Sequence, residues 1–135
     1  MVLTEWTEAK RRQSEVVILG TSHQLHAASA NIQTIDVAGS RLAVLDWVMS
    51  LGVTIDSHLR FDCHASNVAR ACNYHTRALR HVCSLLSDEV VQTVACSIVA
   101  SRLDYCNALL YGTPNATINK LQRAQNNLVR VVCQH

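Results

Sequence analysis

The feature that most constrains the fold is a change in hydrophobic period near residue 62. Beyond this point apolar side chains recur every three or four positions, which gives an α-helix one apolar face. The first such face carries Val68, Ala71, Cys72, His75, Leu79 and Val82. The opposite face carries Ser66, Asn67, Arg70, Tyr74, Arg77 and His81. The spacing predicts an amphipathic helix of about twenty residues that starts at Asp62.

A second helix is predicted to begin after Ser87, where a capping hydroxyl precedes two acids, Asp88 and Glu89. Acidic side chains are favourable at the positive end of a helix, and serine is a preferred N-cap. We expect this helix to run toward Tyr111 and to end before Gly112, because glycine is favoured just past a helix end.

A third helix is predicted to begin near Asn115, directly after Pro114. Its apolar face carries Ile118, Leu121, Gln125, Leu128 and Val132. The other face carries Lys120, Arg123, Asn127 and Arg130. The last part of the chain is therefore predicted as a bundle of three helices.

Shorter elements are predicted before residue 62, where β-branched residues, period-two alternation and glycine turns indicate strands. The expected order is a helix at residues 4–12, a strand at 14–20, a loop at 23–31, a hairpin of 32–37 with 41–45, and a strand at 48–56. Gly52 within the last strand predicts a bulge or a close approach of another backbone. The fold class is thus α+β, with short N-terminal strands and a hairpin followed by three helices.

Composition bounds the class of protein. A chain of 135 residues with 49% apolar side chains can build a core, and a net charge of +2 is too small to indicate nucleic-acid binding. Residues 1–12 are polar and carry acidic residues, unlike a signal peptide. No apolar run in the sequence approaches the ~20 residues that a membrane-spanning helix needs. We therefore expect an intracellular protein without a membrane partner. Its cysteines are expected to be thiols: Cys63, Cys72, Cys83, Cys96, Cys106 and Cys133.

Catalytic patterns are weak in this chain. The acidic residues are scattered, and the one adjacent pair, Asp88 and Glu89, is explained by a helix start. The four glycines lie far apart, so no phosphate-binding glycine loop is predicted. Cysteines and histidines gather at residues 63–64, 72–75 and 81–83, which leaves a zinc-stabilised domain as an alternative. Without a Cys-x-x-Cys pair, we expect buried thiols instead, and neither a metal site nor a catalytic residue is assigned.

Four segments, in this order, resemble segments of a known family. They are residues 14–21 (SEVVILGT), 50–61 (SLGVTIDSHLRF), 101–112 (SRLDYCNALLYG) and 121–132 (LQRAQNNLVRVV). Together they resemble the C-terminal part of the reverse transcriptase of a non-LTR (LINE-type, jockey-like) retrotransposon. The resemblance covers most of the chain, although each segment alone is a weak motif.

The resemblance implies that residues 1–56 are the end of the polymerase palm with a primer-grip hairpin, and that residues 57–135 are the helical thumb. Leu51, Gly52 and Val53 then correspond to the primer grip, which seats the growing 3′ end. The paired aspartates that bind Mg²⁺ in the family would lie upstream of this chain, which contains no Asp-Asp pair and has Gln13 where the family has lysine. The implied function is a fragment of an RNA-directed DNA polymerase that needs no cofactor of its own.

The implied partners are an RNA/DNA template–primer and the missing palm and fingers, and the implied location is nuclear or cytoplasmic. The thumb surface would consist of cations and one histidine on two helices: Arg70, Arg77, His81, Lys120, Arg123 and Arg130. Such faces can meet phosphates without reading sequence, but any solvated helix also carries arginines. A small autonomous α-rich interaction module remains the alternative. A sheet with open edges favours the fragment, and a covered sheet favours the module.

Overall fold

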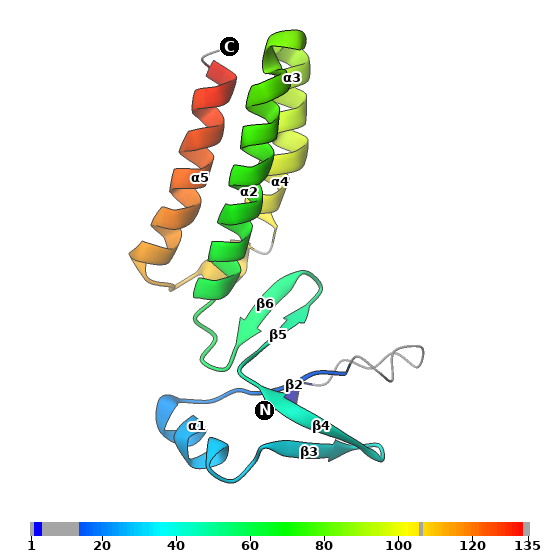
Figure 1. Cartoon of the computed structure of the whole chain (residues 1–135). Helices are drawn as coiled ribbons and strands as arrows, with labels where there is room; N and C mark the ends of the chain where they lie inside the picture. Colours follow the sequence, from blue (N-terminus) through cyan, green and yellow to red (C-terminus); the bar gives the residue numbers. More distant parts are fainter. Residues whose placement is uncertain (1, 4–13, 106, 134–135) are drawn as a thin grey trace. The chain divides into compact units, whose positions relative to one another are not determined.

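The computed structural model describes residues 2–3, 14–105 and 107–133, so the helix predicted at residues 4–12 lies outside the described residues. The chain divides into two compact units, Met1–Arg60 and Phe61–His135. The first contains the strands and the second is helical, which confirms the α+β class. Figure 1 shows the elements of each unit.

The first unit contains a four-stranded sheet with the strand order β1-β2-β4-β3. The strands are β1 (Val2–Leu3), β2 (Val16–Ile18), β3 (Thr34–Val37) and β4 (Ser40–Leu45). β2 pairs antiparallel with β1 and parallel with β4, so the strand predicted at residues 14–20 is confirmed. Val16 and Val17 point to opposite faces of the sheet, and both are fully buried. β2 is therefore covered on both faces.

The hairpin predicted from residues 32–45 is confirmed. β3 and β4 pair antiparallel, with Val37 opposite Ser40. The two residues between them, Ala38 and Gly39, have φ angles of 49° and 79°. Positive φ at both central positions is the pattern of a type I′ turn, whose twist matches that of the strands it joins.

The loop predicted at residues 23–31 is wrong, because Ser22–Ser29 forms the helix α1. Thr21 is its N-cap, and the Thr21 hydroxyl accepts a hydrogen bond from the backbone N–H of Gln24. The Gln24 side chain in turn accepts from the Thr21 backbone N–H at 3.0 Å. This capping box satisfies two amides at the start of the helix, so a polar segment with weak amphipathicity becomes helical.

The single strand predicted at residues 48–56 is also wrong. The segment is a hairpin of β5 (Trp47–Ser50) and β6 (Val53–Asp56), which form a separate two-stranded sheet. Leu51 and Gly52 lie between the strands with φ angles of 48° and 79°. Gly52 is therefore a turn residue between two strands, and the bulge predicted inside a single strand is wrong.

The helical unit begins with α2 (Asp62–Val82) and ends with α5 (Asn115–Cys133), which confirms the first and third predicted helices. Between them the chain forms α3 (Asp88–Val94), the π-helix η3 (Ala95–Ala100) and α4 (Ser101–Asp104) in succession. The expected end at Tyr111 is wrong, because Tyr105 has an extended backbone with ψ 122° and stops the helix. A 3₁₀ turn, η4 (Asn107–Leu110), follows, and the detail of three simple helices is not confirmed.

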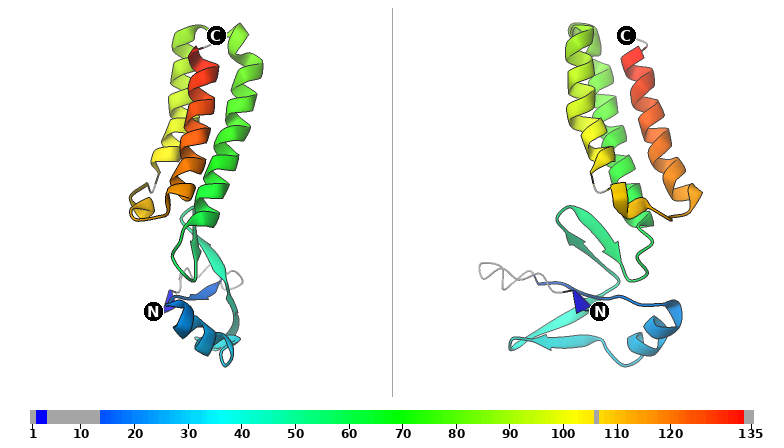
Figure 2. Two further views of the ribbon diagram at one scale, coloured as in Figure 1. Left: turned by 90° about the vertical axis from the view of Figure 1, so that its left-hand side faces the viewer. Right: turned by 180° about the vertical axis from the view of Figure 1, so that it is seen from behind.

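The core of this unit lies where α2, α5 and the α3–η3–α4 segment pack side by side, as Figures 1 and 2 show. Its buried members are mostly small: Ala69, Cys72, Leu79, Val91, Ala95, Val99, Ala124, Leu128 and Val131. The predicted apolar faces are partly wrong, since Val82, Ile118 and Gln125 are exposed. Small residues let helices approach closely. The buried face of each helix is therefore centred on its alanines, Ala69, Ala95 and Ala124, and not on the larger residues of the predicted face.

Candidate nucleic-acid interface

Helices α2 and α5 run parallel, which Figure 1 shows and two cross-helix hydrogen bonds establish. Lys120 Nζ donates to Ser66 Oγ at 3.1 Å, and Asn127 Nδ2 donates to Asn73 Oδ1 at 3.1 Å. Both pairs have the same offset in the chain, 54 residues. Seven residues therefore separate the two contacts on each helix, which is close to two helical turns.

A third contact fixes the first turns of the two helices. The hydroxyl of Thr117, buried on α5, donates to the Asp62 carboxylate in the first turn of α2. Asp62 also lies at the positive end of the α2 dipole, where a carboxylate is favourable. Because these contacts hold the register, side chains next to them on the two helices face one another.

A groove of about 500 Å³ follows this polar seam on the solvent side. Its cations are Arg70 and Arg77 from α2, and Lys120 and Arg123 from α5. The other lining residues are Ser66, Ala69, Asn73, Tyr74 and Asn127. Among the described residues that line it, none is acidic. We call this cavity, together with an adjoining hollow lined by Thr76 and Arg80, the α2–α5 groove.

The groove continues into a second hollow of about 270 Å³ that shares Asn73, Arg77 and Asn127 with the first. Arg80 lines this extension together with Thr76. Arg80 was not among the predicted site residues, although it lies one helical turn after Arg77. It adds a fifth cation to the groove.

The structure brings together four of the six side chains predicted for the helical surface. His81 and Arg130 are exposed on the same two helices, but they do not line the groove. His81 follows Arg80 by one residue, which turns it about 100° around the helix and away from α5. The predicted surface is therefore divided into groove cations and two outer side chains.

The predicted primer-grip residues lie in the first unit, at the β5–β6 turn. Leu51 is 79% exposed and Gly52 is also exposed, whereas Val53 is buried at the start of β6. Trp47 and Met49 are exposed on the same face of β5, because successive strand residues point to opposite faces. Leu51 follows them in the turn and adds a third exposed apolar side chain.

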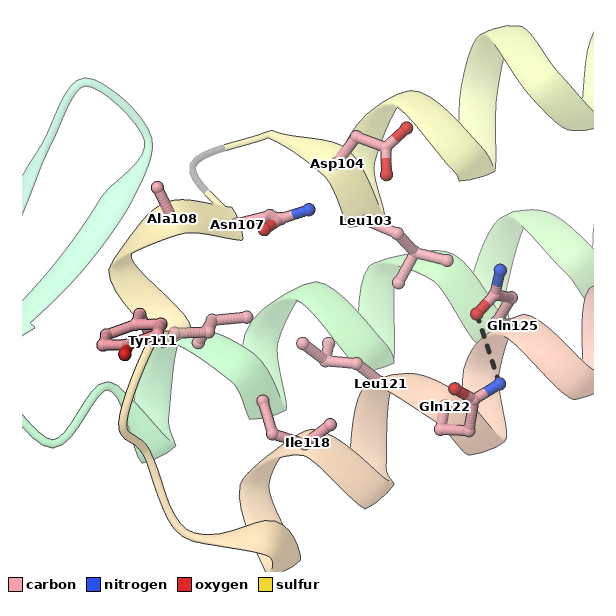
Figure 3. Close-up of a pocket in the computed structure, with 10 residues that line it drawn as sticks. Leu103, Asp104, Asn107, Ala108, Tyr111, Ile118, Leu121, Gln122 and Gln125 are labelled. Atoms are coloured by element: carbon pink, nitrogen blue, oxygen red, sulfur yellow. Dashed lines mark hydrogen bonds between the residues drawn. The ribbon is translucent and has the colours of Figure 1, made fainter.

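A different hollow, of about 410 Å³, lies between the α4–η4 segment and α5 (Figure 3). Leu103, Ile118 and Leu121 give it an apolar surface, and Asp104 adds a carboxylate. Gln122 is held by a hydrogen bond to Gln125 at 3.2 Å. No lysine or arginine lines this part of the described structure, so it lacks the charge that phosphate binding requires.

The histidines and cysteines do not converge. Within residues 2–3, 14–105 and 107–133, no three His, Cys, Asp or Glu side chains come together as a metal site requires. His64 and Cys72 are both buried in α2. Burial lowers the pKa of His64, and burial raises the pKa of the Cys72 thiol, an effect that Arg102 partly opposes. The five cysteines in the described residues are free thiols.

Among the helices described, none is both long enough and apolar enough to cross a bilayer. Comparisons of the chain with protein-family models, with curated proteins and with solved structures give no match.

Proposed function

We propose that this chain is a fragment of a non-LTR retrotransposon reverse transcriptase, an RNA-directed DNA polymerase. In this proposal the helical unit holds the template–primer, and the β5–β6 hairpin helps to place the primer. The chain has no catalytic centre of its own, because its sequence contains no paired aspartates for the two catalytic metal ions.

The α2–α5 groove is the observation that carries the proposal. Two cationic helix faces that are separated by about fifty residues in the sequence meet in one cavity, with cations on both walls. Cations without acidic neighbours are suited to phosphate, and asparagine and serine can donate to the sugar–phosphate backbone. An ordinary solvated face would intersperse both signs of charge.

The β5–β6 hairpin supports the idea of a fragment. In the part of the chain that the structure describes, β5 and β6 pair only with each other, so each of these two strands has an open edge. A two-stranded hairpin is marginally stable by itself, and Trp47, Met49 and Leu51 are exposed on it. An open sheet with exposed apolar side chains is expected where a neighbouring palm segment is missing.

A second candidate is an autonomous α-rich interaction module, and the separate core of the helical unit favours it. The two functions differ in their response to salt. A module that binds a protein has no reason to bind RNA–DNA hybrids, whereas a phosphate-binding surface loses affinity steeply as salt rises.

The test is binding of the full chain to a fluorescent RNA–DNA hybrid at several salt concentrations, together with primer extension in Mg²⁺. We expect salt-sensitive binding, no extension, and a loss of about tenfold or more when Arg70 and Arg77 both become alanine. Arg102→Ala is the control, since Arg102 is an exposed arginine outside the groove. Primer extension by the purified chain, or affinity that is independent of salt, would refute the proposal.

A further inference from the structure

We infer that the α2–α5 groove takes one strand of nucleic acid, as an extended phosphodiester backbone, and does not bridge the two strands of a duplex. This rests on the proposed function and assigns the form of ligand that the site accepts.

The groove is narrow because its two walls are neighbouring helices. The cross-helix hydrogen bonds at Ser66–Lys120 and Asn73–Asn127 are both 3.1 Å, and packed helices have axes about 8–10 Å apart. A nucleic-acid duplex is wider than this spacing, since the major groove of a B-form duplex, only a part of its width, is already about 12 Å across. A cavity of about 500 Å³ is of the size that holds one drug-sized molecule. A duplex can therefore place only one of its two strands in this groove.

The charges lie on both walls. Arg70, Arg77 and Arg80 come from α2, whereas Lys120 and Arg123 come from α5. Like charges on facing walls repel each other. An anion placed between the walls is attracted by the cations of both, and this attraction offsets their repulsion. A polyanion that lies inside the groove therefore meets more cations at short range than one that rests on its rim.

The length and the lining fit a strand. The groove follows α2 from Ser66 to Arg80, which is about 20 Å at the rise of an α-helix, enough for a few nucleotides. Tyr74 lines the same cavity and is 69% exposed, so its ring is available to stack on a base. Aromatic stacking combined with a cationic track is the usual way of binding single strands without sequence preference.

The experiment measures affinity of the full chain for a single-stranded DNA, a single-stranded RNA and an RNA–DNA hybrid. Each probe is about twelve nucleotides long, within the range of known single-strand site sizes. We expect at least one single strand to bind as tightly as the hybrid. The logarithm of affinity should fall against the logarithm of salt with a slope of about −3.5, for five cations at about 0.7 each.

Variants distinguish the groove from its outer edge. Arg80→Ala and Lys120→Ala should each weaken single-strand binding about fivefold at ~0.1 M salt and reduce the slope by about 0.7. Arg130→Ala, on the outer face of α5, should change affinity less than about twofold, as should the control Arg102→Ala. Tyr74→Ala should weaken binding about tenfold, with Tyr74→Phe close to wild type. Circular dichroism verifies that each variant is folded.

The outcomes separate the two proposals. A hybrid that binds more than about tenfold tighter than both single strands, or an Arg130→Ala effect as large as that of Arg80→Ala, overturns the single-strand inference and leaves the proposed function standing. The absence of salt-dependent binding to all three probes overturns both.

Discussion

Replacing Thr117 with valine tests the contact that joins the first turns of α2 and α5. Thr117 is 1% exposed, and its hydroxyl donates to the Asp62 carboxylate. Valine keeps the branched shape and loses the hydroxyl. A hydrogen bond to a charged group contributes about 1.5–3 kcal/mol to stability. Because Asp62 is half-buried and water can reach it, we expect a loss near the lower end, about 2 kcal/mol.

Thermal unfolding followed by circular dichroism at 222 nm, the ordinary helix signal, gives the result directly. For a unit of this size, 1 kcal/mol corresponds to a shift of about 4–8 °C, so the midpoint should fall by about 10 °C. Urea unfolding should show a lower midpoint with an unchanged slope, because the surface exposed on unfolding is the same.

Thr93→Val is the matched control. Thr93 is exposed on α3, and its hydroxyl donates to the Glu89 carbonyl at 2.8 Å, one turn earlier. Water replaces that bond when the hydroxyl is removed, so the change should stay within about 0.5 kcal/mol. If Thr117→Val and Thr93→Val have the same midpoint, the Thr117–Asp62 contact does not hold the register of α2 against α5.

Three further predictions concern charge, a turn and a buried ring. Arg77→Gln should raise the melting temperature at low salt, since it relieves repulsion in the groove, and the gain should vanish at high salt; a decrease at low salt would contradict the assigned repulsion. Ala38→Asn should stabilise the β3–β4 turn by about 1 kcal/mol, because asparagine tolerates positive φ. Gly39→Ala should destabilise the same turn through its positive φ, although the added Cβ would meet no atom within 4 Å. Equal urea unfolding midpoints for the two variants would contradict this. Burial lowers the pKa of His64, so the unfolded state binds a proton more readily than the folded state does. The stability contributed by the neutral His64 ring is therefore fully present above about pH 6.5, the unfolded pKa, and is lost as the pH falls through the folded pKa. An NMR titration of the His64 ring with a midpoint at or above 6.5 would refute that assignment.

The long helices could be predicted from sequence because their signal extends over many turns. α2 and α5 begin at the predicted positions, Asp62 and Asn115. Shorter signals failed. The capping box of Thr21 and Gln24 is visible in the sequence and should have indicated α1. The turn at Leu51 and Gly52 carried less information, since leucine rarely adopts positive φ and does not mark a turn.

The site was predictable only one helix at a time. Spacing assigns Arg70 and Arg77 to one face of α2, and Lys120 and Arg123 to one face of α5. It does not give the direction in which the helices pack or the register between them, because these depend on the intervening α3–η3–α4 segment. Arg80 was missed for this reason. It lies near the edge of the apolar face, and its side chain becomes part of a cationic surface only when α5 is beside α2.

The small residues of the core connect the packing to the proposed ligand. Ala69 and Ala124 are 9% and 0% exposed where α2 and α5 pack, and Cys72 is fully buried. Leucines in place of Ala69 and Ala124 would hold α2 and α5 farther apart, and long cations such as Lys120 could then not reach across the seam. Close approach thus narrows the groove and brings its two cationic walls together. The same packing that closes the core therefore creates the repulsion that a bound phosphodiester strand would relieve.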